Sequence, residues 1–303
     1  MTKKVNGATA SRMNRLALAL NIACLLITAP LLAADPTFLR RSLAEAQPKP
    51  DDLTANARSV SYKPLFGSGD TQASQLKGIA RYGELTLEPG GASAIVSYPN
   101  EEQLYFILEG AGTLIYEERQ APVRKNDFMY LPPGVRHGVA NPSSQPLRLL
   151  VMGYRLGDFH PAGPPPELQL ANAEDVHAQP LDQHGSTVQF KLLMGTTESK
   201  RDKLAAAHKM VSLFIMDFEP GGTNIPHHHD MEEEIYFVLQ GHGDMVAGGG
   251  ADGNEGRYPA RAGDAFFIRL NATVGFYSGS HEGEPHDMVL AVRSTYPFAP
   301  GPR

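Results

Sequence analysis

Tryptophan is absent from this chain of 303 residues, and cysteine occurs once, as Cys24. A single cysteine cannot form an intrachain disulfide, so stability must come from a packed core and any bound metal. The formal net charge is −6, and lysine and arginine form no long run of the kind that a phosphate backbone needs. We therefore expect no nucleic-acid partner.

A long amphipathic helix pattern is also missing. Short segments rich in Val, Ile, Tyr and Phe alternate with turns, and glycine (30) and proline (24) are plentiful without a strict period. Such a pattern is typical of short strands joined by tight turns. The hydrophobic content of 42% is enough for a substantial core. We predict an all-β protein with a sandwich or barrel in each half.

The first 34 residues are typical of an export signal. Four basic residues precede a nearly uncharged, mostly apolar run from Leu16 to Leu32, and small residues up to Ala34 form a cleavage site. We expect cleavage near Ala34 and a periplasmic or secreted protein that has no contact with the membrane afterwards. The alternative is an uncleaved anchor, because the run is just long enough to span a bilayer.

The chain contains an internal duplication. Residues 88–112 align without a gap to residues 219–243, and 11 of these 25 positions are identical. The prolines between residues 159 and 166 cannot enter the interior of a sheet, so they mark the boundary between the halves. The expected organisation is a signal peptide (1–34), an N-terminal arm (35–57), a first barrel (58–158), a Pro-rich linker (159–185) and a second barrel (186–303). The polar arm either wraps the partner barrel or remains free of it.

Three side chains in the second half have the spacing of a metal site. His227 and His229 lie two residues apart, so in a strand they point to the same face. Glu234 is out of phase with them in a single strand, but a tight reversal around residues 230–232 would bring it alongside on a neighbouring strand. Two imidazoles and one carboxylate then converge, which suits a borderline divalent cation.

These residues resemble the first motif of the cupin superfamily. Gly221, His227, His229, Glu234 and Gly241 fill all of its places. The second cupin motif is nearly complete in the first half, where Asn126 replaces its leading Gly and the remaining positions match: Pro132, Gly134, His137 and Asn141. Two such halves are similar to a bicupin. The resemblance implies two tandem cupin barrels, each a double-stranded β-helix or jelly roll with a pocket in its mouth.

Departures from these motifs limit the expected metal to the second barrel. The first half has lost three of the four implied ligands, which are replaced by Val96, Tyr98 and Gln103. His137 remains there, but one imidazole does not hold a metal. The second half lacks the ligand of the second motif, because Val274 stands at its place. We predict His286, on the next strand, as a fourth ligand beside His227, His229 and Glu234.

Several residues are candidates for catalysis or substrate binding beside the metal. The expected general bases are Asp217, Tyr236 and Tyr277, and Arg269 either meets a substrate carboxylate or forms a salt bridge at the rim. The expected cofactor is one divalent metal, with Fe(II) or Mn(II) favoured over Zn(II) or Ni(II). The expected partner is a small-molecule substrate, and homo-oligomerisation is left open.

Three functions fit these observations. The leading hypothesis is a metal-dependent oxygenase of the dioxygenase type acting on a small organic substrate, because three ligands leave coordination positions open. The second is a redox-neutral isomerase, lyase or amidohydrolase in which the metal acts as a Lewis acid. The third is a non-catalytic protein that binds a small ligand such as a sugar or a phenolic compound.

Overall fold

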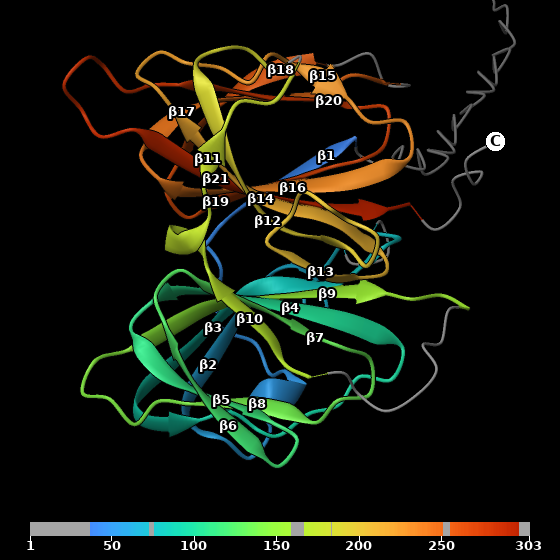
Figure 1. The fold of residues 1–303 in the computed structure, drawn as a ribbon, viewed down its shortest axis with the longest axis vertical. Helices are drawn as coiled ribbons and strands as arrows, with labels where there is room; N and C mark the ends of the chain where they lie inside the picture. Colours follow the sequence, from blue (N-terminus) through green and yellow to red (C-terminus); the bar gives the residue numbers. More distant parts are fainter. Residues whose placement is uncertain (1–36, 73–75, 159–166, 183, 251–254, 297–303) are drawn as a thin grey trace, which may run out of the picture. The chain divides into compact units, whose positions relative to one another are not determined.

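The computed structural model describes residues 37–72, 76–158, 167–182, 184–250 and 255–296, and they form almost entirely β-structure (Figure 1). Two curled barrels of mainly antiparallel strands follow one another along the chain, which confirms the predicted all-β fold of two jelly-roll barrels. The expected signal peptide, residues 1–34, lies outside the described residues. Among the described residues, no helix has both the length and the apolar character needed to cross a membrane.

The first barrel is a single curled sheet that also includes one strand from the segment following it. Its strand order is β10-β7-β4-β9-β3-β8-β5-β6, with β2 paired to β3. The strands are β2 (Arg58–Gly67), β3 (Ile79–Ala92), β4 (Glu101–Glu109), β5 (Ala111–Tyr116), β6 (Arg119–Arg124), β7 (Asp127–Leu131), β8 (His137–Ala140), β9 (Leu147–Arg155) and β10 (Gln169–Asn172).

The second barrel is built from two sheets, ordered β1-β19-β16-β21-β14-β12-β11 and β15-β20-β17-β18. Strand β13 pairs with β12. The strands are β1 (Phe38–Ser42), β11 (Ala178–Gln179), β12 (Val188–Thr196), β13 (Leu204–Ala207), β14 (Met210–Phe218), β15 (His227–His228), β16 (Glu232–Gln240), β17 (His242–Gly248), β18 (Glu255–Arg261), β19 (Asp264–Ile268), β20 (Thr273–Ser278) and β21 (Asp287–Thr295). Two short 3-10 helices, η1 (Asp52–Thr54) and η3 (Ala173–Asp175), complete the described elements.

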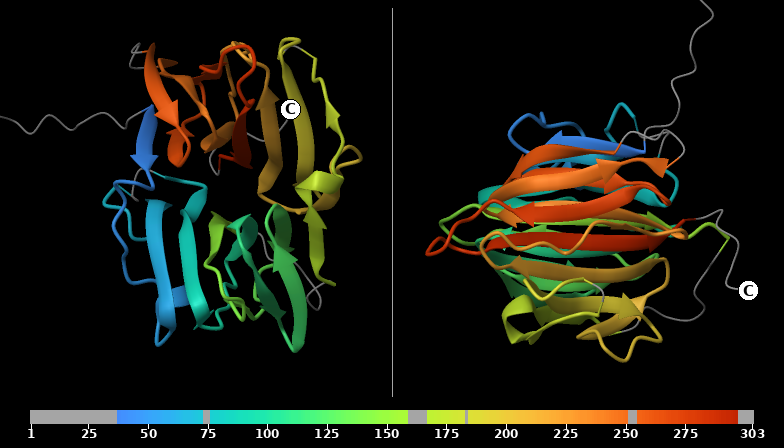
Figure 2. Two further views of the ribbon diagram at one scale, coloured as in Figure 1. Left: turned by 90° about the vertical axis from the view of Figure 1, so that its left-hand side faces the viewer. Right: turned by 90° about the horizontal axis from the view of Figure 1, so that it is seen from above.

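The two barrels exchange their leading strands. Strand β1 precedes the first barrel in the chain, yet it pairs with β19 of the second barrel, with Ser42 opposite Asp264. Strand β10 precedes the second barrel, yet it pairs with β7 of the first, with Asn172 opposite Asp127. Figure 2 shows β1, in blue, at the edge of the second barrel. The N-terminal arm and the linker thus each contribute a strand to the sheet of the other half.

A pair of buried glutamates joins the barrels in the same reciprocal way. The carboxylate of Glu102 accepts hydrogen bonds from three consecutive backbone N–H groups, at 208–210, over 2.8, 2.8 and 2.6 Å. The duplicated residue Glu233 accepts one from the backbone N–H of Gly78 over 2.9 Å. Both side chains are almost fully buried. Charged acceptors give the stronger class of hydrogen bond, so these contacts fix the barrels against each other.

The hydrophobic core has three parts because each central strand is buried on both faces. Along β16, Ile235 and Phe237 join a cluster shared by both barrels, whereas Tyr236 and Val238 point into the second barrel. Strand β4 repeats this alternation, and a third cluster fills the first barrel. A strand buried on two sides reads as a continuous hydrophobic run, which is why both duplicated strands lack polar alternation.

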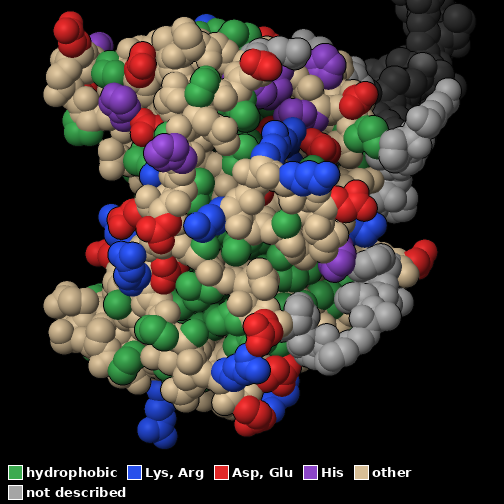
Figure 3. Space-filling view, in the orientation of Figure 1, with side chains coloured by type: hydrophobic (Ala, Val, Ile, Leu, Met, Phe, Trp, Pro, Cys, Tyr) green, Lys and Arg blue, Asp and Glu red, His purple; other side chains and the backbone are tan. Residues whose placement is uncertain are grey.

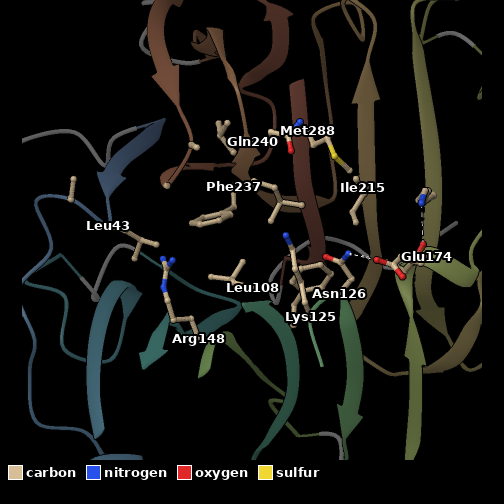
Figure 4. A pocket seen from close by; sticks show the side chains of 18 residues that line it. Leu43, Leu108, Lys125, Asn126, Arg148, Glu174, Ile215, Phe237, Gln240 and Met288 are labelled. Carbon is tan, nitrogen blue, oxygen red and sulfur yellow. Dashed lines mark hydrogen bonds between the residues drawn. The ribbon is translucent and has the colours of Figure 1, made fainter. Parts of the chain in front are cut away.

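A cavity of about 470 Å³ lies between the barrels at the edge of the shared cluster (Figure 4). Phe237, Ile215 and Leu108 contribute apolar side chains to its lining, and Lys125 and Arg148 contribute cations. No histidine is among the described residues that line it. The cavity is therefore separate from the predicted metal site.

Candidate metal site

The polypeptide reverses direction between the two histidines and the glutamate. Strand β15 ends at His228 and β16 begins at Glu232. His227 lies opposite Val274 on β20, while Glu234 lies opposite Ile268 on β19 and Arg293 on β21. The backbone N–H of Asn271 donates to the carbonyl of His229 over 2.6 Å, which holds the end of the turn. This is the reversal that the phase of the three residues requires.

The three side chains converge. One donor atom from each of His227, His229 and Glu234 can be chosen so that all three lie within 4.8 Å of one another. The Nε2 atom of His229 is 3.3 Å from Oε2 of Glu234, and the two imidazole centroids are 4.9 Å apart at 84°. Across the described part of the chain, no other group of three or more His, Cys, Asp or Glu side chains gathers in this way.

The carboxylate of Glu234 fits a bound cation. Its side chain is only 2% exposed, and neither oxygen has a hydrogen-bond partner. The nearest cationic nitrogen is Nε of Arg293, at 4.0 Å. A buried ionised carboxylate without partners is strongly unfavourable, and buried charges are usually paired or coordinate metals. A divalent cation between this carboxylate and the two imidazoles would supply the missing partner.

His227 is held in the form that a metal requires. Its Nδ1 is hydrogen-bonded to the carbonyl of Ile225 over 2.8 Å, which leaves Nε2 as the ligand nitrogen. Burial lowers the pKa of His227, although the contact with that carbonyl opposes the shift. Metal ligation needs a neutral imidazole, so burial favours the competent protonation state.

The prediction that His286 is a fourth ligand is wrong for this geometry. His286 precedes β21, and the strand must run on to Arg293 before it reaches the level of Glu234. Seven residues of strand span roughly 23 Å. His286 instead pairs with Asp217, with 2.6 Å between Nδ1 and Oδ1, beside a different surface pocket. The prediction came from its place near the strand that follows the second-motif segment. That place did not show at which end of the barrel His286 lies.

A cavity of about 220 Å³ opens beside the three residues. Most of its wall is apolar or aromatic, and two arginines add positive charge. The lining beyond the three candidate ligands is Leu181, His184, Phe190, Leu192, Arg201, Ser212, Phe214, Tyr236 and Arg293. In the view of Figure 3, the visible histidines lie mainly on the second barrel, in the upper part of the molecule.

The sequence did not identify Arg201, Arg293 or His184 as site residues. They come from three segments outside the motif, and only the closing of the sheet brings them together. Arg293 carried one overlooked signal, since a charged residue interrupts the apolar run of β21. In the structure Nη1 of Arg293 lies 3.2 Å from Glu232, and the guanidinium carbon lies 5.7 Å from the centroid of the Phe214 ring.

The structure brings only one of the three expected general bases to the cavity. Tyr236 lines it, but its hydroxyl accepts a hydrogen bond from Asn224 over 2.8 Å, and burial raises its pKa well above the ordinary value. Tyr236 therefore stays protonated and is no base. Asp217 is paired with His286, and the ring of Tyr277 lies 3.9 Å from the guanidinium carbon of Arg257.

Arg269 does not line the cavity. Its backbone N–H donates to the carbonyl of Thr37, and its charge acts on Glu233, where it opposes the rise in pKa that burial causes. A role for Arg269 in holding a substrate carboxylate is therefore not supported. The arginines nearer the candidate ligands are Arg293 and Arg201.

An arginine occupies the equivalent place in the first barrel. There Val96 lies opposite His137, as His227 lies opposite Val274. Arg81 donates to the hydroxyl of Tyr98 over 3.0 Å. It also pairs with Glu101 and Asp51, each over 3.2 Å. A guanidinium thus neutralises the acidic residues of this end of the barrel.

The arginine comes from a different strand in each barrel. In the first barrel Arg81 on β3 lies opposite Gly153 on β9. In the second barrel Ser212 on β14 lies opposite Arg293 on β21. In both barrels an arginine therefore lies opposite a small residue on the paired strand. The arginine is on the earlier strand of the pair in the first barrel and on the later strand in the second.

Comparisons with known proteins agree with this architecture. A family model described as a cupin domain matches twice, at residues 83–153 and 214–286. The chain is a two-domain cupin. An uncharacterised protein of Methanocaldococcus jannaschii is 30% identical over 71 residues, which are 23% of this chain and 57% of that protein. The chain thus spans little more than half of that relative.

Solved structures share the fold over nearly the whole chain. Protein Ylba of E. coli has a TM-score of 0.64 at 15% identity, covering 91% of this chain and 98% of its own. A Pseudomonas aeruginosa protein named as glyoxylate-induced has a TM-score of 0.65 at 20% identity, covering 92% and 95%. The oxalate decarboxylase of Lactobacillus farciminis, in a formate complex, has a TM-score of 0.64 at 14% identity, covering 86% and 87%. At these identities the likeness establishes the fold alone.

Proposed function

We propose that the second barrel holds one divalent metal through His227, His229 and Glu234, and that the protein is a metal-dependent enzyme. The observation that carries this proposal is the buried carboxylate of Glu234, which lacks a hydrogen-bond partner and faces two imidazoles. Two histidines and one carboxylate are the ligand set of non-haem Fe(II) oxygenases, so oxygen-dependent chemistry is the reaction class we favour. Mn(II) is the second choice, and Zn(II) and Ni(II) use similar ligands.

We infer that the substrate is a small organic anion. The cavity of about 220 Å³ has room for only a small molecule, and its lining carries the cations Arg293 and Arg201. A guanidinium binds a carboxylate through two parallel hydrogen bonds, which orients it as well as attracting it. Two proteins of the same fold are named for glyoxylate and oxalate, and both of those compounds are small carboxylates.

The residues of the chain then have distinct tasks. The metal, when bound, would supply redox or Lewis-acid chemistry at the positions that the three ligands leave open. Arg293 would bind and orient the substrate carboxylate, and its contact with Glu232 fixes its own position. Phe190, Phe214 and Leu192 would exclude water from the reacting end of the substrate. An aromatic and apolar wall lowers the local dielectric, which strengthens each of these electrostatic contacts.

Metal analysis and oxygen uptake test the proposal together. We expect close to one metal per chain in the purified protein, and loss of that metal in His227→Ala and Glu234→Gln. His286→Ala is the matched control, because this histidine lies at the other end of the barrel. Unchanged metal content in the first two variants would refute the site.

Oxygen consumption with small carboxylates separates the reaction classes. The oxygenase predicts uptake that stops when the metal is removed. Turnover without oxygen would instead support a redox-neutral enzyme, an alternative that the likeness to oxalate decarboxylase favours. A metal-stripped protein that binds its carboxylate at full strength would support a binding protein without catalysis.

We also propose export, on the basis of the basic flank and apolar run in residues 1–34. Sequencing the N-terminus of the protein isolated from its own cells tests this. Cleavage near Ala34 would place Asp35 first. A retained Leu16 to Leu32 segment in the membrane fraction would contradict export with cleavage.

A further inference from the structure

We propose that His184, from the segment between the barrels, is a fourth ligand of the metal in the second barrel. This inference rests on the proposed function, because it adds a residue to the same centre. His184 lies outside both cupin motifs, at the start of the second half. It lines the same cavity as His227, His229 and Glu234.

A fourth protein ligand is compatible with the proposed function, because a six-coordinate ion bound by four side chains would still keep two positions open. The motif position that would supply it holds Val274, whose apolar side chain cannot donate a lone pair. His286, the residue expected from sequence to replace it, lies at the other end of the barrel. Among the residues that line the cavity, His184 is the one remaining imidazole.

The spacing of the imidazole rings fits a shared ion. His184 and His227 have ring centroids 5.1 Å apart at 79°, and the pair His227 and His229 has 4.9 Å at 84°. Two imidazoles bound to one metal at about 2.1 Å, with an angle between about 90° and 110° at the ion, have centroids roughly 4.5 to 5.2 Å apart. Both observed distances fall in this range. The ring geometry of the pair His184 and His227 therefore matches that of the pair His227 and His229.

The hydrogen bonding of His184 also matches that of a ligand. Its Nδ1 is bonded to the backbone carbonyl two residues earlier, that of Asp182, over 2.8 Å. His227 has the same bond to Ile225, over 2.8 Å. His137, which fills the ligand position of the second motif in the first barrel, bonds to Val135 over 3.0 Å. In each case Nδ1 is engaged and Nε2 remains for a metal, an arrangement typical of ligating histidines.

Packing positions the ring of His184. Phe190 lies edge-on to it, with centroids 5.1 Å apart, and Leu181 of the same segment lines the cavity beside it. In the structure His184 is not one of the three residues whose donor atoms converge within 4.8 Å. Coordination would therefore require the imidazole of His184 to move toward the ion when the metal binds.

Co(II) binding to the full-length protein tests the proposal. We expect His184→Ala and His184→Gln to raise the Kd for Co(II) at least about tenfold and to change its visible spectrum. His177→Ala is the matched control, because His177 lies on the same segment and is exposed. Thermal unfolding of the metal-free variants shows whether each remains folded.

A second measurement needs no variant. Electron paramagnetic resonance of the Cu(II)-loaded wild type should show coupling to three imidazole nitrogens, whereas only two would overturn the proposal. Co(II) affinity and spectra in His184→Ala equal to those of the wild type would also overturn it. If the wild type itself fails to bind Co(II), or His227→Ala binds it equally well, the proposed metal site is wrong. The two failures are therefore distinguishable.

Discussion

Lowering the pH from about 7 to about 4 should destabilise the protein through His137, the buried imidazole of the first barrel. Its side chain is 1% exposed, and Nε2 has no hydrogen-bond partner. The rings of Tyr98 and Tyr105 pack against it, with centroids 5.9 and 5.6 Å away. Burial lowers the pKa of His137 to about 4 from an ordinary value of 6.5, and the charge of Arg81 acts in the same direction.

The size of the effect follows from this shift. Between pH 6.5 and about 4 the unfolded chain binds a proton at this site that the folded protein does not bind. The contribution of His137 to the free energy of unfolding is therefore fully present above the unfolded pKa of 6.5, and it is lost as the pH drops through this window. The pKa of His137 differs by about 2.5 between the unfolded and the folded protein. At about 1.36 kcal/mol for each pH unit, this difference corresponds to about 3 kcal/mol of stability.

Urea unfolding near pH 7 and near pH 4 measures this loss. Other groups also titrate in the window, so the comparison is between wild type and His137→Phe, which keeps an aromatic ring among the two tyrosines. The variant should lose about 3 kcal/mol less than the wild type over the same pH interval. His177→Phe, at an exposed position, should behave as the wild type does. An equal loss in wild type and His137→Phe would show that His137 takes up no proton on unfolding.

Three further predictions follow from the contacts described above. Glu102→Ala should lower the free energy of unfolding by about 3 kcal/mol or more, because three buried N–H donors lose a charged acceptor; a change below about 1 kcal/mol in urea unfolding would contradict this. Glu234→Gln should weaken metal binding more than about tenfold, yet calorimetry should find the metal-free form about as stable as the wild type, since the buried carboxylate accepts no hydrogen bond and Arg293 lies 4.0 Å away. Arg293→Met should raise KM for a carboxylate substrate about tenfold or more, and an unchanged KM in steady-state kinetics would exclude contact with the substrate.

The fold was predictable because its signal is local and repeated. The duplicated segments each hold a short apolar run between glycines, and two copies of one pattern predict two copies of one barrel. The strand exchange was not predictable in the same way. Strand β1 is five residues long and contains Arg40 and Arg41, so no hydrophobic period links it to β19. Only the completed sheet shows where such a strand pairs.

The candidate site was predictable only where one stretch of chain carries it. His227, His229 and Glu234 lie within eight residues, and strand phase alone argues that they converge. Arg293 and His184 reach the cavity through pairing and packing between distant segments, which spacing does not encode. His286 was misplaced for a related reason. Spacing placed His286 beside β21, but it does not encode the register of that strand, which decides at which end of the barrel His286 lies.

The pairing of Phe38 with Ile268 has a practical consequence. The earliest strand of the described chain has no neighbour to join until β19 has been synthesised, so it waits unpaired through most of translation. A truncation that removes it would leave β19 as an open sheet edge, which is a template for aggregation. Removing residues of the first described strand would therefore destabilise the second barrel before the first.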